Sequence, residues 1–187
     1  MAVADFKNCV LIASPHLIDE NFERAVTYIF DHGHAGSAGL IINKPLNLSF
    51  TNILKGLEIS TSKNNLNSVQ VCRGGPVEPT AGFLLHEELE ESQNKKDGYA
   101  FKENLGSSKR YRENFSTLPQ NLAGLFAIGH AGWGPGQLEE EIRQGFWLYG
   151  RANKSILFEV PFEERWSFAL KALGIESTKI GPYVGHA

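Results

Sequence analysis

The sequence predicts a compact single domain of the α+β class, residues 1–187, built on a mostly antiparallel sheet. Short β-branched and apolar runs outnumber the amphipathic helical patterns. The earliest of these runs are joined by the glycine-rich stretch 32–37, which is typical of an antiparallel hairpin. Strands and helices do not alternate regularly, as they would in a doubly wound parallel sheet. With 42% hydrophobic residues and no linker or internal repeat, the chain is expected to fold around its own core.

The first half of the chain is predicted to hold most of the sheet. The run from Cys9 to Ala13 is continuous and apolar, and residues 26–30 are β-branched and aromatic. The predicted strands of this half are 9–13, 26–30, 39–43, 68–72 and 82–86. A short amphipathic helix is expected after Ser49, because the apolar residues that follow it recur at helical spacing.

The second half begins with the polar segment 87–120, which is interpreted as a mobile flap or as irregular strands. The remaining predicted elements are strands at 122–128, 147–150 and 156–160 and helices at 138–146 and 162–173. Between the first of these strands and the first helix lies a glycine-rich turn, 129–136. In that helix, Glu139 is expected to pair with Arg143 one turn later.

The charge balance argues against direct nucleic-acid binding. The chain has 18 Lys and Arg against 21 Asp and Glu, a net charge of -3. Sequence-independent binding to a phosphate backbone needs a clustered basic footprint. The most basic stretch, 95–112, is interleaved with acidic residues such as Asp97 and Glu103, so it is interpreted as a solvated loop.

Cysteine usage and hydropathy predict a cytoplasmic protein. Cys9 and Cys72 are the only cysteines, and they form no CxxC motif, so both are expected to stay reduced. The chain shows no basic region followed by a long apolar stretch at its start. No run approaches the roughly 20 apolar residues of a membrane span, and no membrane contact is expected.

The motifs match no established cofactor or metal site. The loop 129–136 joins a predicted strand to a predicted helix, which is the order found in phosphate-binding loops, but it fits neither the P-loop nor the GxGxxG pattern. His86 and Glu90 do not form an HExxH motif, and His32 and His34 lie in a turn. The sequence therefore predicts no cofactor and no metal.

Candidate nucleophiles fail the same kind of test. Neither Ser14 nor Ser37 lies in a GxSxG motif. Cys72 would gain reactivity from Arg73 if the two side chains met, but neighbours in a strand point to opposite faces. Glu78 stands where a phosphatase-like motif would need arginine. Inert burial of the thiol is favoured over catalysis.

Several motifs together resemble the bacterial AlgH/YqgE family. They are Asn43-Lys44-Pro45, Gly74-Gly75-Pro76-Val77, Gly82-Phe83-Leu84-Leu85-His86, Gly129 to Leu138, and Glu164-Arg165-Trp166. Their order and spacing cover residues 11–187, and the chain departs from the family pattern over 87–120. The resemblance implies a branched, partly barrel-like sheet surrounded by helices. It also implies a role as a transcriptional regulator, with no established reaction, cofactor or catalytic residue.

The main functional hypothesis is a non-enzymatic binding or regulatory protein, with the transcriptional role taken from the resemblance. The turns are rich in backbone donors and acceptors and poor in acids, bases and nucleophiles. They therefore favour polar recognition of a protein or small-molecule partner, and we expect them to meet on one side of the molecule. The candidate binding residues are Asn43, Lys44, Gly74, Gly75, His130, Gly132, Trp133, Gly134 and Gln137.

Two alternatives stay open. The first is a hydrolase-type enzyme that uses His130 or His86 as general base beneath the polar flap. A serine, cysteine or second carboxylate beside His130 would favour it, whereas a lone histidine packed under Trp133 would not. The second alternative is that the motifs only satisfy turn geometry and that a protein-interaction surface lies elsewhere.

Overall fold

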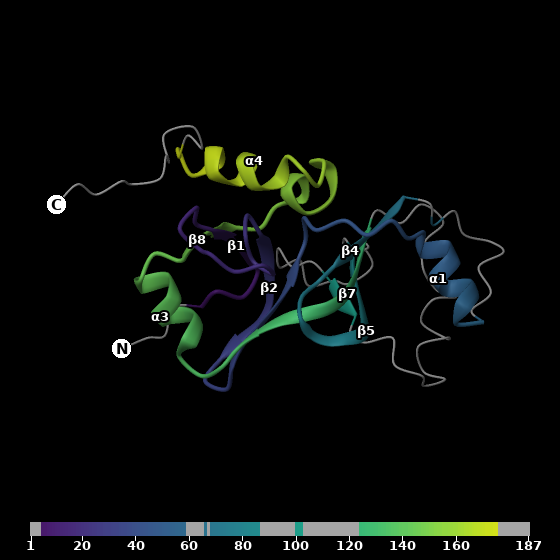
Figure 1. Ribbon diagram of the computed structural model, residues 1–187, viewed down its shortest axis with the longest axis horizontal. Helices are drawn as coiled ribbons and strands as arrows, with labels where there is room; N and C mark the ends of the chain where they lie inside the picture. Colours follow the sequence, from purple (N-terminus) through teal and green to yellow (C-terminus); the bar gives the residue numbers. More distant parts are fainter. Residues whose placement is uncertain (1–4, 59–65, 67, 87–99, 103–123, 176–187) are drawn as a thin grey trace, which may run out of the picture.

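The computed structural model describes residues 5–58, 66, 68–86, 100–102 and 124–175, and these form one eight-stranded sheet with helices around it (Figure 1). The strands are β1 (Cys9–Ala13), β2 (Val26–Gly33), β3 (Gly36–Ile41), β4 (Val69–Arg73), β5 (Val77–His86), β6 (Ala100–Lys102), β7 (Gly124–Trp133) and β8 (Trp147–Arg151). The order of hydrogen-bonded neighbours is β6-β5-β7-β3-β2-β1-β8, and β4 pairs with β7 outside this path.

Strand β7 is the branch point of the sheet. It pairs antiparallel with β3 and β5 and parallel with β4, and every other strand pairing among the described residues is antiparallel. The predicted α+β class with a mostly antiparallel, branched sheet is confirmed. The sheet does not close into a barrel, since β6 and β8 lie at opposite ends of the pairing order.

The helices lie at three places around this sheet (Figure 1). They are α1 (Phe50–Gly56), α3 (Gln137–Arg143), the π-helical turn η1 (Ser155–Glu159) and α4 (Arg165–Ala172). Helix α4 covers β1 and β2, α3 contacts β3 and β8 near the amino terminus, and α1 lies beside β4 at the opposite end of the molecule. Each amphipathic helix therefore buries its apolar side against a different part of the sheet.

The strand predicted at 156–160 is wrong, because that segment forms η1. Asn153 Oδ1 accepts a hydrogen bond from the Ile156 N–H at 3.0 Å and so starts a helical turn. The Val160 N–H then donates to Ser155 O at 2.9 Å, which is the i to i+5 pattern of a π turn. Pro161 follows, and the chain enters the turn before α4.

Several strands are longer than predicted, among them β2, which continues past residue 30 to Gly33. β7 continues to Trp133 through half of the predicted turn, because its last residues pair with Ser37 to Gly39 of β3. β5 begins at Val77, with a shift of register against β7 before Gly82. The predicted flap 87–120 lies outside the described residues except for β6.

The core consists of three apolar clusters. The largest lies between the sheet and the segment η1 to α4 and includes Leu170. A second surrounds α1, where the Phe50 and Phe126 rings have centroids 4.9 Å apart. The third lies under α3 and includes Leu138 and Trp147. Within the described parts of the chain, no helix combines the length and the apolarity that a membrane span requires.

Candidate functional site

Three of the turns meet at one place, which we call the crossing; its segments are 43–46, 73–75 and 128–130. The Arg73 N–H donates to Lys44 O at 2.8 Å, and the Gly74 N–H donates to Ile128 O at 2.8 Å. In return, Gly74 O accepts from the Ile41 N–H at 2.8 Å. Segments far apart in the sequence are thus joined backbone to backbone.

The glycines of the crossing are required by close approach of two backbones. A Cβ on Gly74 would lie 2.1 Å from Gly129 O, and a Cβ on Gly75 would lie 2.2 Å from His130 O. Gly129 has φ +74°, and a Cβ there would lie 2.5 Å from Gly75 O. Only glycine lets the chain after β4 pass this close to β7.

Asn43 and Lys44 hold the loop that precedes β2. Asn43 Oδ1 accepts from the Val26 N–H at 2.8 Å, and its Nδ2 donates to Arg24 O at 2.8 Å. Lys44 Nζ donates to Glu23 O at 2.7 Å. Arg24 adopts φ +51°, so the Asn43 amide fixes the carbonyl of a residue in the left-handed region. The side chains of Asn43 and Lys44 therefore shape the surface around them.

A buried arginine lies beneath the crossing. Arg165 is 0% exposed, and its Nε donates to Val160 O at 2.9 Å while its Nη2 donates to Gln70 Oε1 at 2.7 Å. Its Nη1 donates to Ile42 O, and the guanidinium lies 4.5 Å from the centroid of the Phe162 ring. Burial lowers the pKa of Arg165 to about 10, because desolvation disfavours the charged form. The arginine fastens α4 to the ends of β3 and β4.

His130 lies at the crossing and not under Trp133. Its ring packs edge-on against Phe83, with centroids 5.4 Å apart. Its Nδ1 is buried without a hydrogen bond, 3.8 Å from Glu78 Oε2. Glu78 has φ +45° in the irregular first part of β5. The carboxylate that the hydrolase alternative needs is present, but no described serine or cysteine is hydrogen bonded to His130.

The thiol at the crossing is inert. Cys72 is fully buried, and its Sγ donates to Ile41 O at 3.2 Å. Burial raises the pKa of Cys72 to about 12, and the nearby Arg165 only partly opposes this. Arg73 points to the exposed face, as predicted for a strand neighbour. Cys72 is therefore a protonated, inaccessible thiol at neutral pH and not a nucleophile.

The far end of β7 is built differently. There Glu141 of α3 gathers three donors: Trp133 Nε1 at 2.9 Å and Trp147 Nε1 at 2.8 Å bind its Oε2, and Gln137 Nε2 at 2.8 Å binds its Oε1. The Gly134 N–H donates to Gln137 Oε1 at 2.9 Å. We call this arrangement the α3 end; its polar groups satisfy one another.

The predicted site residues therefore fall into two groups. At the crossing lie Asn43, Lys44, Gly74, Gly75 and His130; at the α3 end lie Trp133, Gly134 and Gln137. Gly132 lies between the two, beside Val77, the strand partner of His130. The two groups are separated along β7. A Cβ on Gly132 or Gly134 would make only an ordinary contact at 3.7 Å, so packing does not require glycine at either position.

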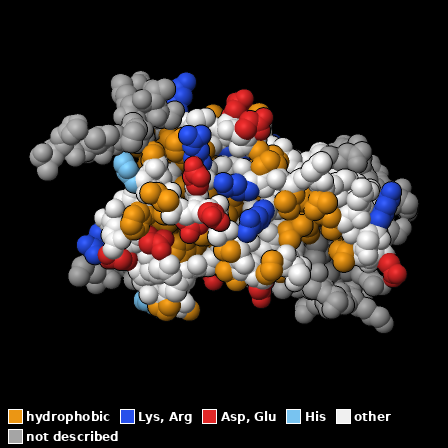
Figure 2. All heavy atoms as spheres, viewed as in Figure 1, with side chains coloured by type: hydrophobic (Ala, Val, Ile, Leu, Met, Phe, Trp, Pro, Cys, Tyr) orange, Lys and Arg blue, Asp and Glu red, His pale blue; other side chains and the backbone are white. Residues whose placement is uncertain are grey.

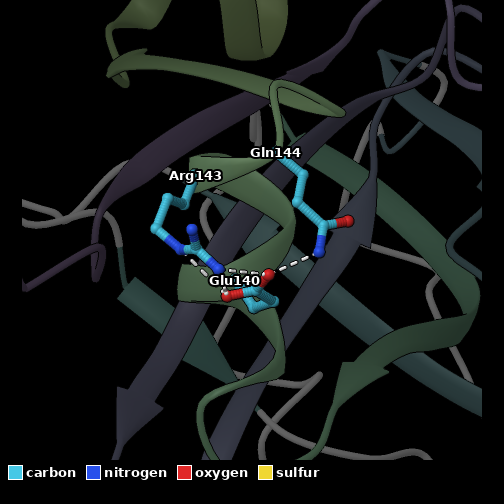
Figure 3. Close-up of polar contacts among 3 residues, drawn as sticks. All are labelled: Glu140, Arg143 and Gln144. Carbon is cyan, nitrogen blue, oxygen red and sulfur yellow. Dashed lines mark hydrogen bonds and ion pairs between the residues drawn. The ribbon is translucent and has the colours of Figure 1, made fainter.

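The carboxylate of Glu140, in the first turn of α3, is also hydrogen bonded to neighbouring side chains, those of Arg143 and Gln144 (Figure 3). Glu140 accepts hydrogen bonds from Arg143 Nε at 3.0 Å and from Gln144 Nε2, and the bond from Arg143 is the main reason that the pKa of Glu140 is lowered. The predicted pair of Glu139 with Arg143 is wrong. Glu139 Oε1 instead lies 3.8 Å from His32 Nε2.

A serine, a histidine and an acid line up beneath α3. Ser37 Oγ lies 2.7 Å from His32 Nδ1 across the β2–β3 hairpin, and Glu139 faces the other ring nitrogen. The His32 side chain is only 3% exposed and Ser37 is 7% exposed. The hydroxyl is thus enclosed in the packing, and the contacts fasten α3 to the hairpin.

The second histidine of the hydrolase alternative lies elsewhere. His86 pairs with Gly124, whereas His130 lies six residues further along β7 (130 minus 124), about 20 Å at the usual rise of a strand. The two histidines do not share a site. Among the described residues, no three His, Cys, Asp or Glu side chains gather as metal ligands.

Four residues at or beside the crossing were not among the predicted site residues: Arg24, Arg73, Arg165 and Trp166. Trp166 Nε1 donates to Ala13 O at 2.8 Å, and the Arg24 guanidinium lies 5.3 Å from the centroid of its ring. The sequence pattern around Arg165 could have indicated its burial, because Arg165 lies on the apolar face of its helix, with apolar residues one turn before and one turn after it. Arg24 and Arg73 are isolated basic residues with no such signal.

The chain is similar throughout its length to proteins of one bacterial family. The family model described as AlgH-like, DUF179, matches residues 10–178. A UPF0301 protein of Idiomarina loihiensis is 40% identical, with 97% of this chain and 98% of that protein covered. A UPF0301 protein of Pseudoalteromonas translucida is 36% identical over 97% of this chain and 98% of its own length.

Two solved structures of other proteins have a similar fold. The solution structure of the AlgH protein from Pseudomonas aeruginosa is 31% identical, covers all of both chains and superposes with a TM-score of 0.68. The crystal structure of a Corynebacterium diphtheriae protein, DIP2367, shares the fold with a TM-score of 0.66 at 20% identity, over 92% of this chain and 89% of that one. The motifs, the family model and the relatives coincide, and the chain belongs to the AlgH-like (DUF179, UPF0301) family.

Proposed function

We propose that this protein is a non-enzymatic binding or regulatory protein that recognises its partner at the crossing. The observation that carries the proposal is the backbone hydrogen bonding among the three turns, which joins Lys44 to Arg73 and Gly74 to the strand segment that holds His130. The Cys72 thiol nearby does not act as a nucleophile, because it is buried and protonated. Recognition without turnover is the function that this combination supports best.

A transcriptional role, implied by the family resemblance, fits this proposal if it acts through another molecule. The net charge of -3 does not favour direct binding to the phosphate backbone of DNA. We therefore expect regulation by contact with a protein or small molecule.

The experiment is a quantitative capture from bacterial extract on three immobilised chains: wild type, the crossing variant Lys44→Gln/His130→Gln, and the control Lys55→Gln/His34→Gln. The control removes the same two kinds of side chain at exposed positions away from the crossing. Mass spectrometry of retained proteins and small molecules should show at least one component reduced at least fivefold by the crossing variant alone. Identical retention by all three folded chains would show that the crossing is not the recognition surface.

A second candidate function, hydrolysis with His130 as general base, is favoured by one observation. Glu78 is held at φ +45°, a backbone conformation costing of order 1 kcal/mol or more, with its carboxylate 3.8 Å from His130 Nδ1. If this pair were catalytic, His130→Gln and Glu78→Gln would each lower the hydrolysis of p-nitrophenyl acetate or phosphate about 100-fold. On our main proposal, the wild type hydrolyses neither substrate faster than buffer.

A further inference from the structure

Four basic side chains gather around the crossing without an acidic partner: Arg24, Lys44, Arg73 and Arg165. Throughout the described residues, none of them has a carboxylate oxygen within 4.0 Å. The hydrogen bonds of Lys44, Arg73 and Arg165 all go to neutral acceptors. In a chain whose net charge is -3, a local group of unpaired cations is unexpected from composition.

The three cations of this group other than the buried Arg165, namely the exposed Arg24 and Arg73 and the half-buried Lys44, are held in place. Lys44 Nζ donates to Glu23 O at 2.7 Å, and Arg73 Nη2 donates to Asn21 Oδ1 at 2.9 Å. Arg24 lies over the Trp166 ring. Neutral acceptors and an aromatic face orient these groups without neutralising them, so part of the entropy cost of binding an anion has already been met.

These three cations all lie beside one short loop segment. Their side chains or backbones contact the short run 21–24, whose ends can be at most about 11 Å apart, at 3.8 Å between successive Cα atoms. In the view of Figure 2, Lys and Arg side chains gather near the middle of the face, between α4 and β4, with Asp and Glu side chains beside them. We call Arg24, Lys44 and Arg73 the cationic patch.

Donors remain available on the patch. An ammonium group carries three N–H donors and a guanidinium group five, and the described contacts of Lys44 and Arg73 each use one of them. Arg143 offers the contrast, because Glu140 already occupies its guanidinium group (Figure 3). A carboxylate that reached the patch would form charge-assisted hydrogen bonds not yet made.

We propose that the cationic patch binds a short acidic segment of a partner protein. This inference rests on the proposed function and specifies the chemistry of the partner. Two or three carboxylates on an extended segment match the number of cations held beside residues 21–24. A long nucleic-acid backbone fits less well, since three cations would meet only a few of its phosphates, and Asp19, Glu20 and Glu23 of the same loop would repel the phosphates that continue past the patch.

The test uses a fluorescein-labelled peptide, Gly-Glu-Glu-Gly-Glu-Gly, as probe, with anisotropy measured at 20 and 200 mM NaCl. The site variant is Arg24→Gln/Lys44→Gln/Arg73→Gln. The matched control, Lys55→Gln/Arg143→Gln/Arg151→Gln, loses the same net charge away from the patch. We expect the site variant to raise Kd at least tenfold, the control to change it less than twofold, and salt to weaken wild-type binding severalfold.

Three results would overturn the inference. They are no saturable binding of the peptide by wild type, an equal loss in site variant and control, or tighter patch-dependent binding of a labelled 20-nucleotide DNA strand than of the peptide. The last would identify a nucleic acid as the ligand class. None of them repeats the extract experiment: if Lys44→Gln/His130→Gln loses a component while the acidic peptide does not bind, the crossing remains the recognition surface and only the acidic partner is wrong.

Discussion

The crossing and the α3 end look alike in the sequence but differ in what their polar groups do. Both are glycine-rich turns beside β7, and both supplied candidate binding residues. At the α3 end, Glu141 is bound by two indoles and an amide, and Arg143 is bound by Glu140. At the crossing, Arg73 and Lys44 contact only neutral oxygens.

The difference separates two uses of glycine. Gly74 and Gly75 permit one backbone to pass another, and they thereby fix the positions of charged side chains on each side. Gly134 belongs to a turn whose side chains complete one another's hydrogen bonds. The crossing is the better candidate for a recognition site because its side chains have hydrogen-bond donors that are not yet used. Glycine content does not distinguish the two regions.

The largest expected effect comes from a methyl group at the crossing. In Gly75→Ala, the new Cβ would lie 2.2 Å from the His130 carbonyl group, so backbone must move. We expect unfolding in urea to show a loss of at least about 3 kcal/mol, or failure to fold. Gly134→Ala, with its Cβ 3.7 Å from Gln137 Oε1, should change stability by no more than about 0.5 kcal/mol. Equal effects of the two substitutions would show that the close approach is not a constraint.

A smaller effect is expected from the carboxylate that organises the α3 end. Glu141→Gln places an amide nitrogen against a donor, because Trp133, Trp147 and Gln137 all donate to Glu141. We expect a loss of about 2 kcal/mol, measured by urea unfolding with tryptophan fluorescence.

Glu140→Gln is the matched control for Glu141→Gln. Its carboxylate is on the exposed side of α3 and contacts Arg143 and Gln144, so the free energy of unfolding should stay close to that of the wild type. Should Glu140→Gln cost as much as Glu141→Gln, the α3 end would not be held by the carboxylate that binds the indoles.

Sequence patterns predicted the strands and helices better than the site. Apolar periodicity located α4 and α3, since Leu138 and Leu170 lie on faces that become buried. The same periodicity misread 156–160, because β-branched and aromatic residues there are held in a π turn by the Asn153 side chain. Local composition does not report a side chain that caps a turn.

The site was partly predictable for a similar reason. The turns at Asn43 and Gly74 were recognisable, and their convergence was expected. The cationic patch was not, since Arg73 reaches the loop that carries Arg24 through the hydrogen bond of its Nη2 to Asn21 Oδ1, between residues 52 positions apart. Motif spacing carries no information on such a contact.

The smallest expected effect is a pH dependence of stability, which tests whether the Cys72 thiol beside the crossing is shielded from solvent. In a Cys9→Ala background, unfolded Cys72 ionises above pH 9.0, whereas burial raises the pKa of the folded thiol to about 12. The folded state then holds a proton that the unfolded state loses, so stability falls as pH rises from about 9 toward 12. We expect the free energy of unfolding in urea to change differently between pH 8 and pH 10 in Cys9→Ala and in Cys9→Ala/Cys72→Ala. Relative to the double variant, it should fall by about 1.4 kcal/mol in Cys9→Ala, which keeps the Cys72 thiol. Arg165 is present in both chains, so the part of its titration that does not depend on Cys72 subtracts. Parallel pH dependences in the two chains would mean that solvent reaches the thiol, and the argument against Cys72 as a nucleophile would fail with it.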